Sequence, residues 1–463
     1  MVWGGLVASV QAEETVVLVA PLGSRLVYLV DGASGEVRHR WDLPTAGTNA
    51  YLDRAGLMTR HREGPTAGEF DLRGKAGVVE TFDADGTLVE AVSLSTATTL
   101  QHHDFERLPN GNLLATVAEK VPKSRWVALG LDPATLPGDV RYDETIVEVK
   151  PGGIGEAEVV WRWRLRDHLV QDFDSDLPDY GDPAGRPGRV DVNFGEQGRG
   201  RPMGGGGPPM KRGGPPPGDR RGPPPGPFGG PPPGRRGPGR PPRERREPGA
   251  DWIHLNAIDY HPDRDEIIVS SRHLNEVWVI DHSVTTQQAA GPAGDLKYRF
   301  GHPAVWGGEG PQTLFVAHDV RWVPPGVPGA GNVTLFHNRI GHPDGAASTI
   351  DEFALPVDGD GYRFANGRPV APELVSSMGV GPRMFSTRIS GAEKLPDGNV
   401  VICSGDQPLI VEMKPGGEVV WELDRKFGGG PEDDPAYQGG ATFRSPPYRP
   451  SMFSAEVRGK LGL

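Results

Sequence analysis

The sequence predicts an all-β fold, a six-bladed β-propeller that carries a long disordered insert rich in proline and glycine. Three observations support this prediction: a hairpin pattern that recurs six times, a second hairpin before most of its copies, and scarce helical periodicity. Only residues 166–173, RDHLVQDF, have a helical pattern, and that run is short. Two hairpins make a four-stranded sheet, and six such sheets around one axis make the propeller.

The outer hairpins are the clearest repeat. Each has a strand, a glycine-containing turn and a second strand that in most copies ends in an aromatic residue, with apolar and polar residues alternating along both strands. The six copies span residues 25–41, 77–92, 145–163, 275–300, 348–364 and 409–423. Because Trp41, Trp161 and Trp421 stand near the same point of their copies, we expect them to pack between blades.

The inner hairpins precede five of these copies, at residues 50–61, 102–117, 254–273, 318–339 and 390–405. The first copy is truncated at its start. We therefore expect the C-terminal segment RPSMFSAEV, residues 449–457, to supply the missing strand and close the ring.

The insert predicted at residues 182–249 divides the repeats. Residues 201–250 hold 17 Pro, 15 Gly and 11 Lys or Arg against 3 acids, so the segment has little to bury and is predicted to be disordered. The expected organisation is a possible signal-peptide remnant at 1–13, blades at 14–181 and 250–463, and the insert between them. Subtracting the insert's charge of +8 from the total of −12 leaves −20, which argues against nucleic acid as a partner.

Two smaller features bear on location. Cys403 is the only cysteine, so no intramolecular disulfide forms, and its apolar strand predicts a buried thiol. At the N-terminus, small residues follow a short apolar stretch, as at the end of a secretory signal, although a basic segment is missing. We expect a periplasmic or secreted protein. No apolar run is long enough for a membrane helix.

Histidines recur at one position of the inner hairpins. His103, His318 and Ser390 each precede a turn proline by six residues, and Asn256 has the same place before Pro262. The innermost strand of a propeller borders the central channel, so these side chains should converge at its mouth. His254 lies two residues before Asn256. Arg272 and Arg339 stand at the ends of the returning strands, where they should face the same opening.

The segments HHDFERLPNGN, VVWRWRLRDHL, DWIHLNAIDYHPDRDEIIVSSRH, TLFVAHDVRW and ISGAEKLPDGNVVICSG resemble the bacterial arylsulfate sulfotransferases, enzymes that work without PAPS (3′-phosphoadenosine 5′-phosphosulfate) and have a six-bladed propeller. The likeness runs from about Thr98 to Leu423 without the insert. It implies transfer of a sulfuryl group from a phenolic sulfate donor to a phenolic acceptor, with no cofactor. The long insert is the main departure from the family pattern.

Residue by residue, the resemblance implies that His318 is the nucleophile that carries the sulfuryl group. His254, Arg272 and His103 correspond to the sulfate-binding and acid/base residues, with His103 favoured over His102 by register. The chemistry fits: a guanidinium suits an oxyanion, and a neutral imidazole is a competent nucleophile. His254 is expected to protonate the departing phenoxide and later deprotonate the acceptor.

Four further residues are predicted to bind substrate: Asn256, His102, Arg339 and Ser390. Asp104 and Asp319 are expected to form hydrogen bonds inside their own blades, because adjacent strand residues face opposite sides. Trp306, Phe315 and Phe385 are candidate walls for an aromatic substrate. The remaining histidines are expected on surfaces or in loops: His61, His168, His261, His282, His302, His337 and His342.

Two other functions stay open. Three histidines from different blades can hold a divalent ion, which would make a metal-dependent enzyme, although Arg272 beside a metal ion argues against it and we predict no metal. Alternatively, the propeller binds a ligand or partner without catalysis, since a fold alone does not establish activity. The sequence does not indicate an oligomeric state.

Overall fold

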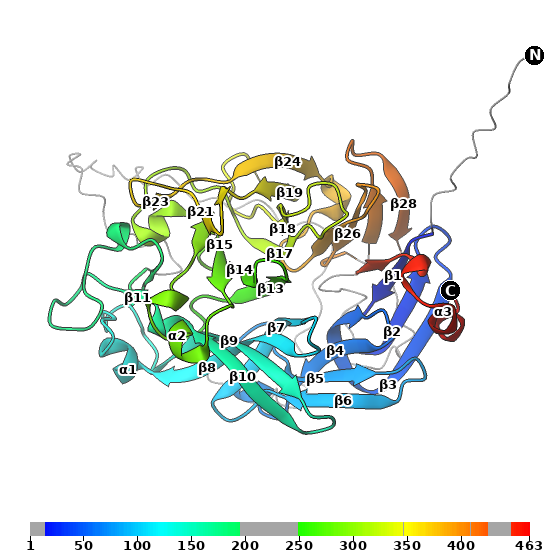
Figure 1. Cartoon of the computed structure of the whole chain (residues 1–463), viewed down its shortest axis with the longest axis horizontal. Helices are drawn as coiled ribbons and strands as arrows, with labels where there is room; N and C mark the ends of the chain where they lie inside the picture. Colours follow the sequence, from blue (N-terminus) through cyan, green and yellow to red (C-terminus); the bar gives the residue numbers. More distant parts are fainter. Residues whose placement is uncertain (1–13, 195–248, 346, 408, 425–445) are drawn as a thin grey trace, which may run out of the picture.

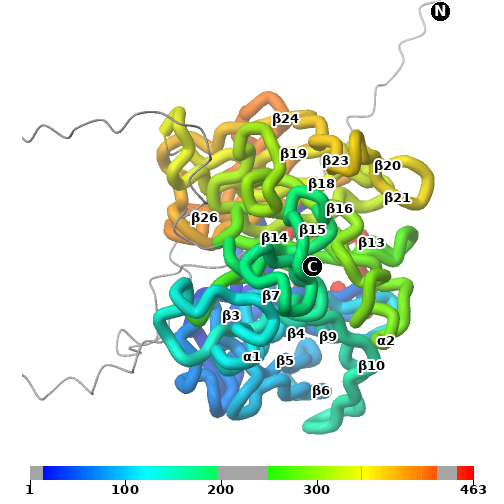
Figure 2. The backbone as a smooth tube through the Cα atoms, turned by 90° about the vertical axis from the view of Figure 1, so that its left-hand side faces the viewer, coloured from blue at the N-terminus to red at the C-terminus, as the bar shows by residue number. Residues whose placement is uncertain are grey.

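The computed structural model describes residues 14–194, 249–345, 347–407, 409–424 and 446–463. The chain is mostly β, as predicted, and its larger sheets are antiparallel. Figure 1 shows them following one another in chain order around a common centre, so that the first strands lie beside the last. Seen from the side, the sheets of the second half of the chain lie above those of the first half (Figure 2). The possible signal remnant at residues 1–13 lies outside the described residues.

A seven-stranded sheet begins the chain. Its order is β29-β1-β2-β3-β4-β5-β6. Strand β3 belongs to two groups, because its first half pairs with β2 and its second half pairs with β4. The strands are β1 (Val16–Val19), β2 (Ser24–Asp31), β3 (Val37–Leu52), β4 (Met58–Glu63), β5 (Gly77–Phe82), β6 (Leu88–Ser93) and β29 (Pro447–Tyr448).

Four four-stranded antiparallel sheets follow, each made of the inner and outer hairpin of one repeat. The first contains β7 (Thr99–Arg107), β8 (Leu113–Pro122), β9 (Val140–Pro151) and β10 (Ala157–Arg164). The second contains β13 (Leu255–His261), β14 (Glu266–Ser271), β15 (Glu276–Asp281) and β16 (Tyr298–Phe300). The third contains β17 (Ala317–Trp322), β18 (Val333–His337), β19 (Thr349–Ala354) and β24 (Glu373–Gly379). The fourth contains β25 (Gly391–Lys394), β26 (Val400–Ser404), β27 (Leu409–Met413) and β28 (Val419–Asp424).

Small elements fill the connections. Short two-stranded sheets are formed by β11 (Leu169–Val170) with β12 (Val190–Asp191), β20 (Val357–Asp358) with β21 (Gly361–Tyr362), and β22 (Phe364–Ala365) with β23 (Arg368–Pro369). The α-helices of the described residues are α1 (Lys123–Val127), α2 (Thr286–Ala289) and α3 (Ala455–Leu461). Short 3-10 turns are Ala67–Glu69, Leu165–Asp167, Pro183–Gly185, Pro292–Gly294, Pro303–Trp306, Pro382–Met384 and Pro450–Met452. Among the described residues, no helix has the length and apolar character needed to cross a membrane.

Three predictions about these connections need correction. The strand that closes the ring against β1 is Pro447–Tyr448, just before the predicted segment, which instead forms a 3-10 turn and helix α3. Residues 166–173 contain only the end of a 3-10 turn and β11, where a helix was expected. Residues 182–194 differ from the predicted disordered insert, because β12 pairs in parallel with β11 and buries Val190 and Val192. The rest of the insert, residues 195–248, lies outside the described residues.

The hydrophobic core is divided into clusters that lie between neighbouring sheets. One cluster joins Ile268 and Val277 to Val333 and Phe353 of the next sheet. Another joins Val17 of the first strand to Ile410 near the C-terminus, so burial of apolar surface also closes the ring. The prediction for the tryptophans is confirmed: the Trp41 and Trp161 indoles donate hydrogen bonds to carbonyls of the adjoining strand group, and Trp421 packs against Gly32.

Candidate active site

Distortions in the innermost strands place the predicted site. Strands β7, β13 and β17 each have a register shift against their partner, at Gln101–Phe105, Leu255–Ala257 and His318–Arg321. Such bulges re-aim side chains and are common beside active sites. His103 and His254 have positive φ angles of 53° and 57°, which are unusual for side chains other than glycine. The local backbone therefore turns these side chains out of the regular strand pattern.

The bulges bring histidines from different sheets together. The rings of His103 and His254 lie 4.4 Å apart in an edge-to-face arrangement, and His273 stacks at a tilt 4.7 Å from His254. Arg272 directly follows β14, and its backbone N–H donates to the His254 carbonyl at 3.1 Å. Burial lowers the pKa of His254, and the charge of Arg272 lowers it further. The structure thus brings three imidazoles together, with His103 and His254 buried and the charge of Arg272 acting on His254.

His318 lies on β17 and both of its ring nitrogens have partners. Nδ1 is 2.6 Å from Oδ1 of Asn338, and Nε2 accepts the N–H of Ile389 at 3.2 Å. The Asn338 amide donates to the carbonyls of Ser386 and Ile389, which fixes its oxygen towards the histidine. His318 therefore carries its proton on Nδ1 and has a lone pair on Nε2. Burial lowers the pKa of His318 to about 4, so the ring is neutral at physiological pH.

A carboxylate orients His254. Its Nδ1 lies 2.6 Å from Oδ2 of Asp251, three residues earlier in the chain. Ionised Asp251 would accept the Nδ1 proton and leave Nε2 of His254 for the site, as second partners of functional histidines commonly do.

A second carboxylate lies behind the histidine pair. His102 has both ring nitrogens engaged: Nε2 lies 3.0 Å from Glu144 Oε2, and Nδ1 lies 2.9 Å from Nδ1 of His103. His102 is fully buried. The neighbour, His103, is the one that meets His254.

Three of the other predicted substrate-binding residues form hydrogen bonds with protein groups. Asn256 accepts from Ser270 Oγ at 2.5 Å and donates to the Ala317 carbonyl at 2.8 Å, which links β13 to β17. Ser390 Oγ accepts the Gly405 N–H at 2.9 Å. Arg339 Nη2 lies 2.8 Å from the ring of His342. Substrate binding by these three and by His102 stays a prediction.

Asp104 and Asp319, which directly follow His103 and His318, belong to a separate group that we call the acid hub. The acid hub comprises Tyr51, Asp104, Glu106, Asp259, Asp319, Arg321 and Glu393. Arg321 lies 2.8 Å from Asp104 and 2.9 Å from Asp319. The Asp104 carboxylate also accepts from Asn49 and from the Ile258 N–H, and Asp319 accepts from the Ala392 N–H. The expected bonds within one blade exist, from Phe105 N–H to Asp104 and from Arg321 to Asp319, but they are only part of the network. These aspartates link successive sheets, because the inner strands converge there.

The family model described as "Arylsulfotransferase (ASST)" matches residues 23–426, which is most of the chain. The chain belongs to the arylsulfotransferase family. The resemblance seen in the sequence is therefore confirmed, and with it an activity of the arylsulfotransferase type in general terms.

Solved structures that resemble this arylsulfotransferase-family chain are remote in sequence. A protein of unknown function from Bacteroides caccae is 12% identical, with a TM-score of 0.43, over 95% of this chain and 100% of that one. The β-propeller domain of Cps50 (Swd1) from Myceliophteria thermophila is 10% identical, with a TM-score of 0.38, over 89% of both chains. No curated protein matches this chain.

Sequence reasoning missed three orienting residues of this arylsulfotransferase-family site: Asn338, Asp251 and Glu144. Asp251 begins the DWIH segment and Asn338 precedes Arg339, so their closeness to predicted site residues was a usable signal. Glu144 lies in the middle of β9, where nothing in the pattern marks it. Long-range pairing of β9 with β8 brings it to the histidines.

Several predicted surface histidines are buried. His61, His168 and His337 are at most 2% exposed. His337 Nδ1 lies 2.8 Å from Asp351, and His168 Nδ1 lies 3.0 Å from Asp295. Hydrogen bonds to such partners offset the free-energy cost of burying a polar ring, so these histidines belong to the scaffold. Among the predicted wall residues, Trp306 is only 5% exposed and Phe315 packs edge-on to His342.

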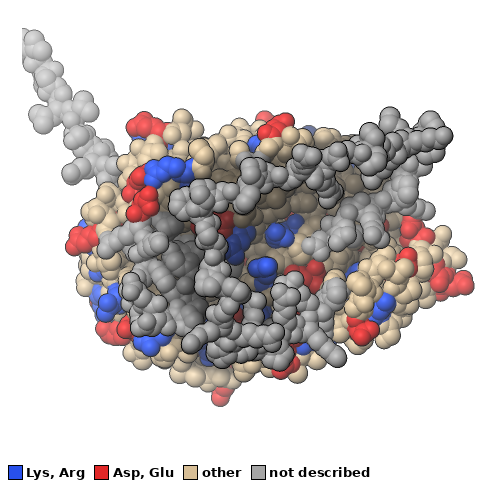
Figure 3. Space-filling model, turned by 180° about the vertical axis from the view of Figure 1, so that it is seen from behind, with Lys and Arg blue, Asp and Glu red and all other residues tan. Residues whose placement is uncertain are grey.

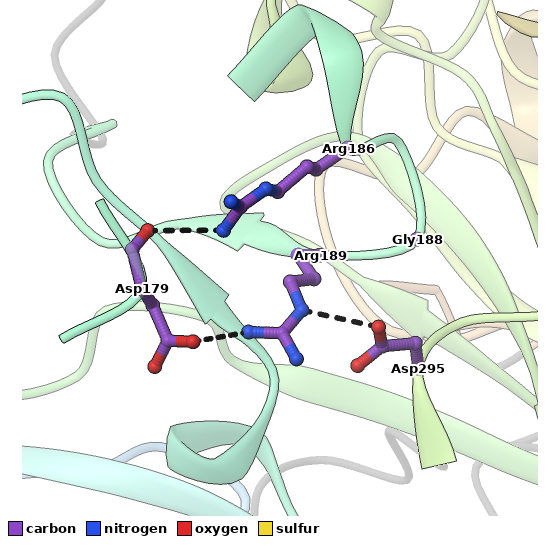
Figure 4. Close-up of a pocket in the computed structure, with 5 residues that line it drawn as sticks. All are labelled: Asp179, Arg186, Gly188, Arg189 and Asp295. Atoms are coloured by element: carbon purple, nitrogen blue, oxygen red, sulfur yellow. Dashed lines mark hydrogen bonds and ion pairs between the residues drawn. The ribbon is translucent and has the colours of Figure 1, made fainter. Parts of the chain in front are cut away.

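The molecule has two concave regions that differ in the side chains that line them. Figure 3 shows a hollowed face with lysine or arginine side chains inside it. A cavity of about 430 Å³ elsewhere is lined by Asp179, Arg186, Gly188, Arg189 and Asp295 (Figure 4). Arg189 is paired there with both carboxylates, at 2.5 and 3.1 Å. Since none of the predicted site residues lines this cavity, the histidine group is the better candidate.

One group in the described residues has metal-ligand geometry. Ligand atoms of Asp251, His254 and His273 all lie within 4.8 Å of one another. A dication there would sit beside Arg272, whose charge already acts on His254. The donor set suits a transition metal, and the neighbouring guanidinium opposes one.

Proposed function

We propose that this protein transfers a sulfuryl group from a phenolic sulfate ester to a phenolic acceptor through a sulfo-His318 intermediate. The observation that carries the proposal is the hydrogen-bonded state of His318. Its Nδ1 proton is held by Asn338, its pKa is lowered to about 4 by burial, and its Nε2 accepts only a backbone N–H. A neutral imidazole keeps a lone pair that can attack at physiological pH.

In the first half-reaction, Nε2 of His318 displaces the Ile389 N–H contact and attacks sulfur. The N–S bond forms, the bond from sulfur to the phenolic oxygen breaks, and the phenoxide leaves with a proton from the site. In the second half-reaction an acceptor phenol loses its proton, its oxygen attacks sulfur, and the N–S bond breaks. His103 and His254 are the groups proposed to exchange these protons.

Arg272 is proposed to bind the sulfuryl oxygens. Its charge lowers the pKa of both His254 and His318, so the guanidinium acts on both rings. Sulfuryl transfer resembles phosphoryl transfer in spreading charge over three equatorial oxygens, and fixed cations stabilise that charge. The same cation disfavours protonation of the nucleophile, which keeps it reactive.

We also propose that the scaffold has six blades and that the protein is exported. Strand β3 serves two strand groups, so the seven-stranded sheet counts as two blades beside the four others. The hydrophobic clusters support this count, since each of six clusters joins two successive groups. Export is supported only by the N-terminal sequence pattern.

The experiment is release of 4-nitrophenol from 4-nitrophenyl sulfate, with and without phenol, by the wild type and His318→Ala. Phenol should stimulate release, and the variant should lose about a thousandfold or more of the rate. Mass spectrometry of the protein incubated with donor alone should show one added sulfuryl group, absent in His318→Ala. His302→Ala, outside the site, is the control. Full activity in folded His318→Ala would overturn the mechanism.

A metal-dependent activity is the second candidate, on the single observation of the Asp251, His254 and His273 group. Metal analysis of purified protein separates the two. A stoichiometric ion whose removal abolishes turnover would favour the metal. Turnover unaffected by chelators would favour direct transfer through His318.

A further inference from the structure

We infer that Glu144, His102 and His103 form a buried proton relay, in which His102 holds a proton beside Glu144 and His103 passes it to and from the phenolic oxygen. The inference rests on the proposed function and deepens it, because it assigns the proton exchange to one histidine. Glu144 and His102 are positioning residues here, and His103 is the group that meets the substrate.

The chain of contacts is continuous. Glu144 Oε2 lies 3.0 Å from His102 Nε2, and the two Nδ1 atoms of His102 and His103 lie 2.9 Å apart. The other carboxylate oxygen of Glu144 accepts the N–H of Leu255 at 3.1 Å. Glu144 and His102 are 2% and 0% exposed. A buried carboxylate with two donors is suited to remain ionised.

Matching hydrogen-bond donors to acceptors allows two protonation states of the relay. When His102 is neutral, its Nε2–H donates a hydrogen bond to Glu144. Its Nδ1 then accepts a hydrogen bond from the Nδ1–H of His103, and Nε2 of His103 carries no proton. When one proton is added, His102 becomes an imidazolium that donates to Glu144 and to His103. The Nε2 of His103 then carries the proton. One proton thus converts His103 from an acceptor into a donor at the nitrogen that His102 does not occupy.

The positive charge belongs on His102 in this scheme. Burial lowers the pKa of His103 well below its usual value, and nearby His254 and His102 lower it further, so His103 does not hold a charge itself. His102 has the Glu144 carboxylate at 3.0 Å to balance a charge. Glu144 stays ionised in this scheme. The relay of Glu144, His102 and His103 is therefore neutral when it holds the extra proton and has a charge of −1 when it has given that proton up.

The proton steps balance. As the phenoxide leaves, its oxygen takes the Nε2 proton of His103, the Nδ1 proton of His102 moves to Nδ1 of His103, and His102 becomes neutral. When the acceptor phenol attacks, its proton goes to Nε2 of His103 and the Nδ1 proton returns to His102. The relay is therefore reloaded by the second half-reaction, and no outside acid or base is consumed.

The bulge that carries the pair is firmly held. The Gln101 amide donates to the carbonyls of His102 and Asp104, and the Thr116 hydroxyl donates to the His102 carbonyl at 2.7 Å. Gly74 lies against the His103 ring, and an added Cβ would come within 2.5–2.6 Å of its Cδ2, Nε2 and Cε1 atoms. A relay needs fixed distances between its rings, and these contacts supply them.

The test compares two donors in Glu144→Gln. Phenoxide is a poor leaving group that needs a proton, whereas 4-nitrophenoxide is a good one that does not. Glu144→Gln keeps the shape of the side chain and removes the charge that balances protonated His102. We expect sulfation of His318 by phenyl sulfate to fall by about a hundredfold, within the usual range for general acid catalysis, and by less than about fivefold with 4-nitrophenyl sulfate.

Asp295→Asn is the matched control, because Asp295 also lies 3.0 Å from a buried histidine, His168, away from the site. It should leave the ratio of the two donors unchanged. An equal loss for both donors, or no loss, in Glu144→Gln would overturn the relay. If Glu144→Gln does not fold, His102→Gln is judged by the same ratio.

The outcomes also separate the relay from the proposed function. A wild type that transfers from both donors, with an unchanged donor ratio in the variants, removes the relay alone. A wild type that never forms sulfo-His318 removes the proposed function, and the relay with it.

Discussion

Two groups of polar residues share strands β7 and β17 but differ in their charges. The histidine group comprises His102, His103, His254, His273 and His318, and the acid hub comprises the seven residues defined above. His103 and His318 belong to the first, and the very next residues, Asp104 and Asp319, belong to the second. Burial lowers the pKa of both histidines, so these two rings are neutral at physiological pH. In the hub, burial raises the pKa of Glu106 and Glu393 to about 8, around the single buried cation Arg321.

The difference shows how one strand serves two purposes. The bulge at each repeated His-Asp directs the imidazole to the candidate site and the carboxylate to the neighbouring sheets. The site keeps neutral groups with available nitrogens, whereas the hub uses its polar atoms in bonds between sheets. We therefore expect substitutions in the hub to change stability and substitutions around the histidines to change turnover.

Arg321→Met should have the largest effect, a loss of about 3–5 kcal/mol in the free energy of unfolding. The change leaves Asp104, Asp319 and Asp259 buried without their shared cation, and breaking a buried ion pair from one side has this cost. Urea unfolding measures it. Arg25→Met is the control, because the Arg25–Asp42 pair has the same 2.8 Å separation but is exposed and should contribute less than about 1 kcal/mol. Equal losses would contradict the hub's role.

Asn338→Ala should lower the rate of His318 sulfation by about a hundredfold, or about 2.7 kcal/mol, with a small effect on donor affinity. The alanine cannot hold the Nδ1 proton, so the nucleophile loses its orientation and its fixed tautomer. Single-turnover kinetics with 4-nitrophenyl sulfate measure the step. A change confined to KM would instead indicate a substrate-binding role.

The companion Asn338→Asp distinguishes orientation from packing. A carboxylate beside Nδ1 favours the protonated ring, so the pKa of His318 should rise from its value of about 4. Because only the neutral ring can attack in the proposed mechanism, activity should be lost at a higher pH than in the wild type as the pH falls. An unchanged acid limb in a folded variant would mean that Asn338 does not control the proton of His318.

The fold was readable because hairpin turns and alternating strands are local signals. Repeat register placed His103 and His318 on corresponding inner strands, and the DWIH segment marked His254. Glu144 was not readable, because its role depends on the pairing of β9 with β8 and on the approach of Leu255 from the next sheet. Such contacts between distant segments leave no spacing in the sequence.

The closing strand and the buried histidines show the same limit. Pro447–Tyr448 is too short to have a pattern, yet it completes the first strand group by pairing with β1. His337 has the polar character of a surface residue, and only the structure shows Asp351 against its ring. Polar residues that are satisfied by distant partners are therefore the ones that sequence reasoning places wrongly.

Gly74→Ala should lower turnover by about tenfold, equivalent to about 1.4 kcal/mol. Its new Cβ would lie 2.5 Å from the His103 ring, which must then move away from the site. Gly74 also has a φ of +66°, so any side chain adds backbone strain. Gly86→Ala controls for strain, because Gly86 has a φ of +81° with open space around it. Gly74→Ala should lose more stability than Gly86→Ala, which has backbone strain alone, and only Gly74→Ala should lose activity.

A last prediction concerns the pH dependence of stability. The pKa of Glu106 is raised by burial, and by Asp259, from 4.5 to about 8. The folded protein therefore binds more protons than the unfolded chain between these values. Stability from this group is fully present below about pH 4.5 and is lost as the pH rises through about 8.

Glu106→Gln removes this ionisation, so the fall in unfolding free energy between about pH 5 and about pH 8 should become smaller by about 3–4 kcal/mol. Urea titrations at several pH values measure it. Glu418→Gln, at an exposed position paired only with Lys414, should leave the slope unchanged. A steeper slope in Glu106→Gln would mean that the hub prefers a charged Glu106, which would make Arg321 a stronger partner than its five carboxylates allow.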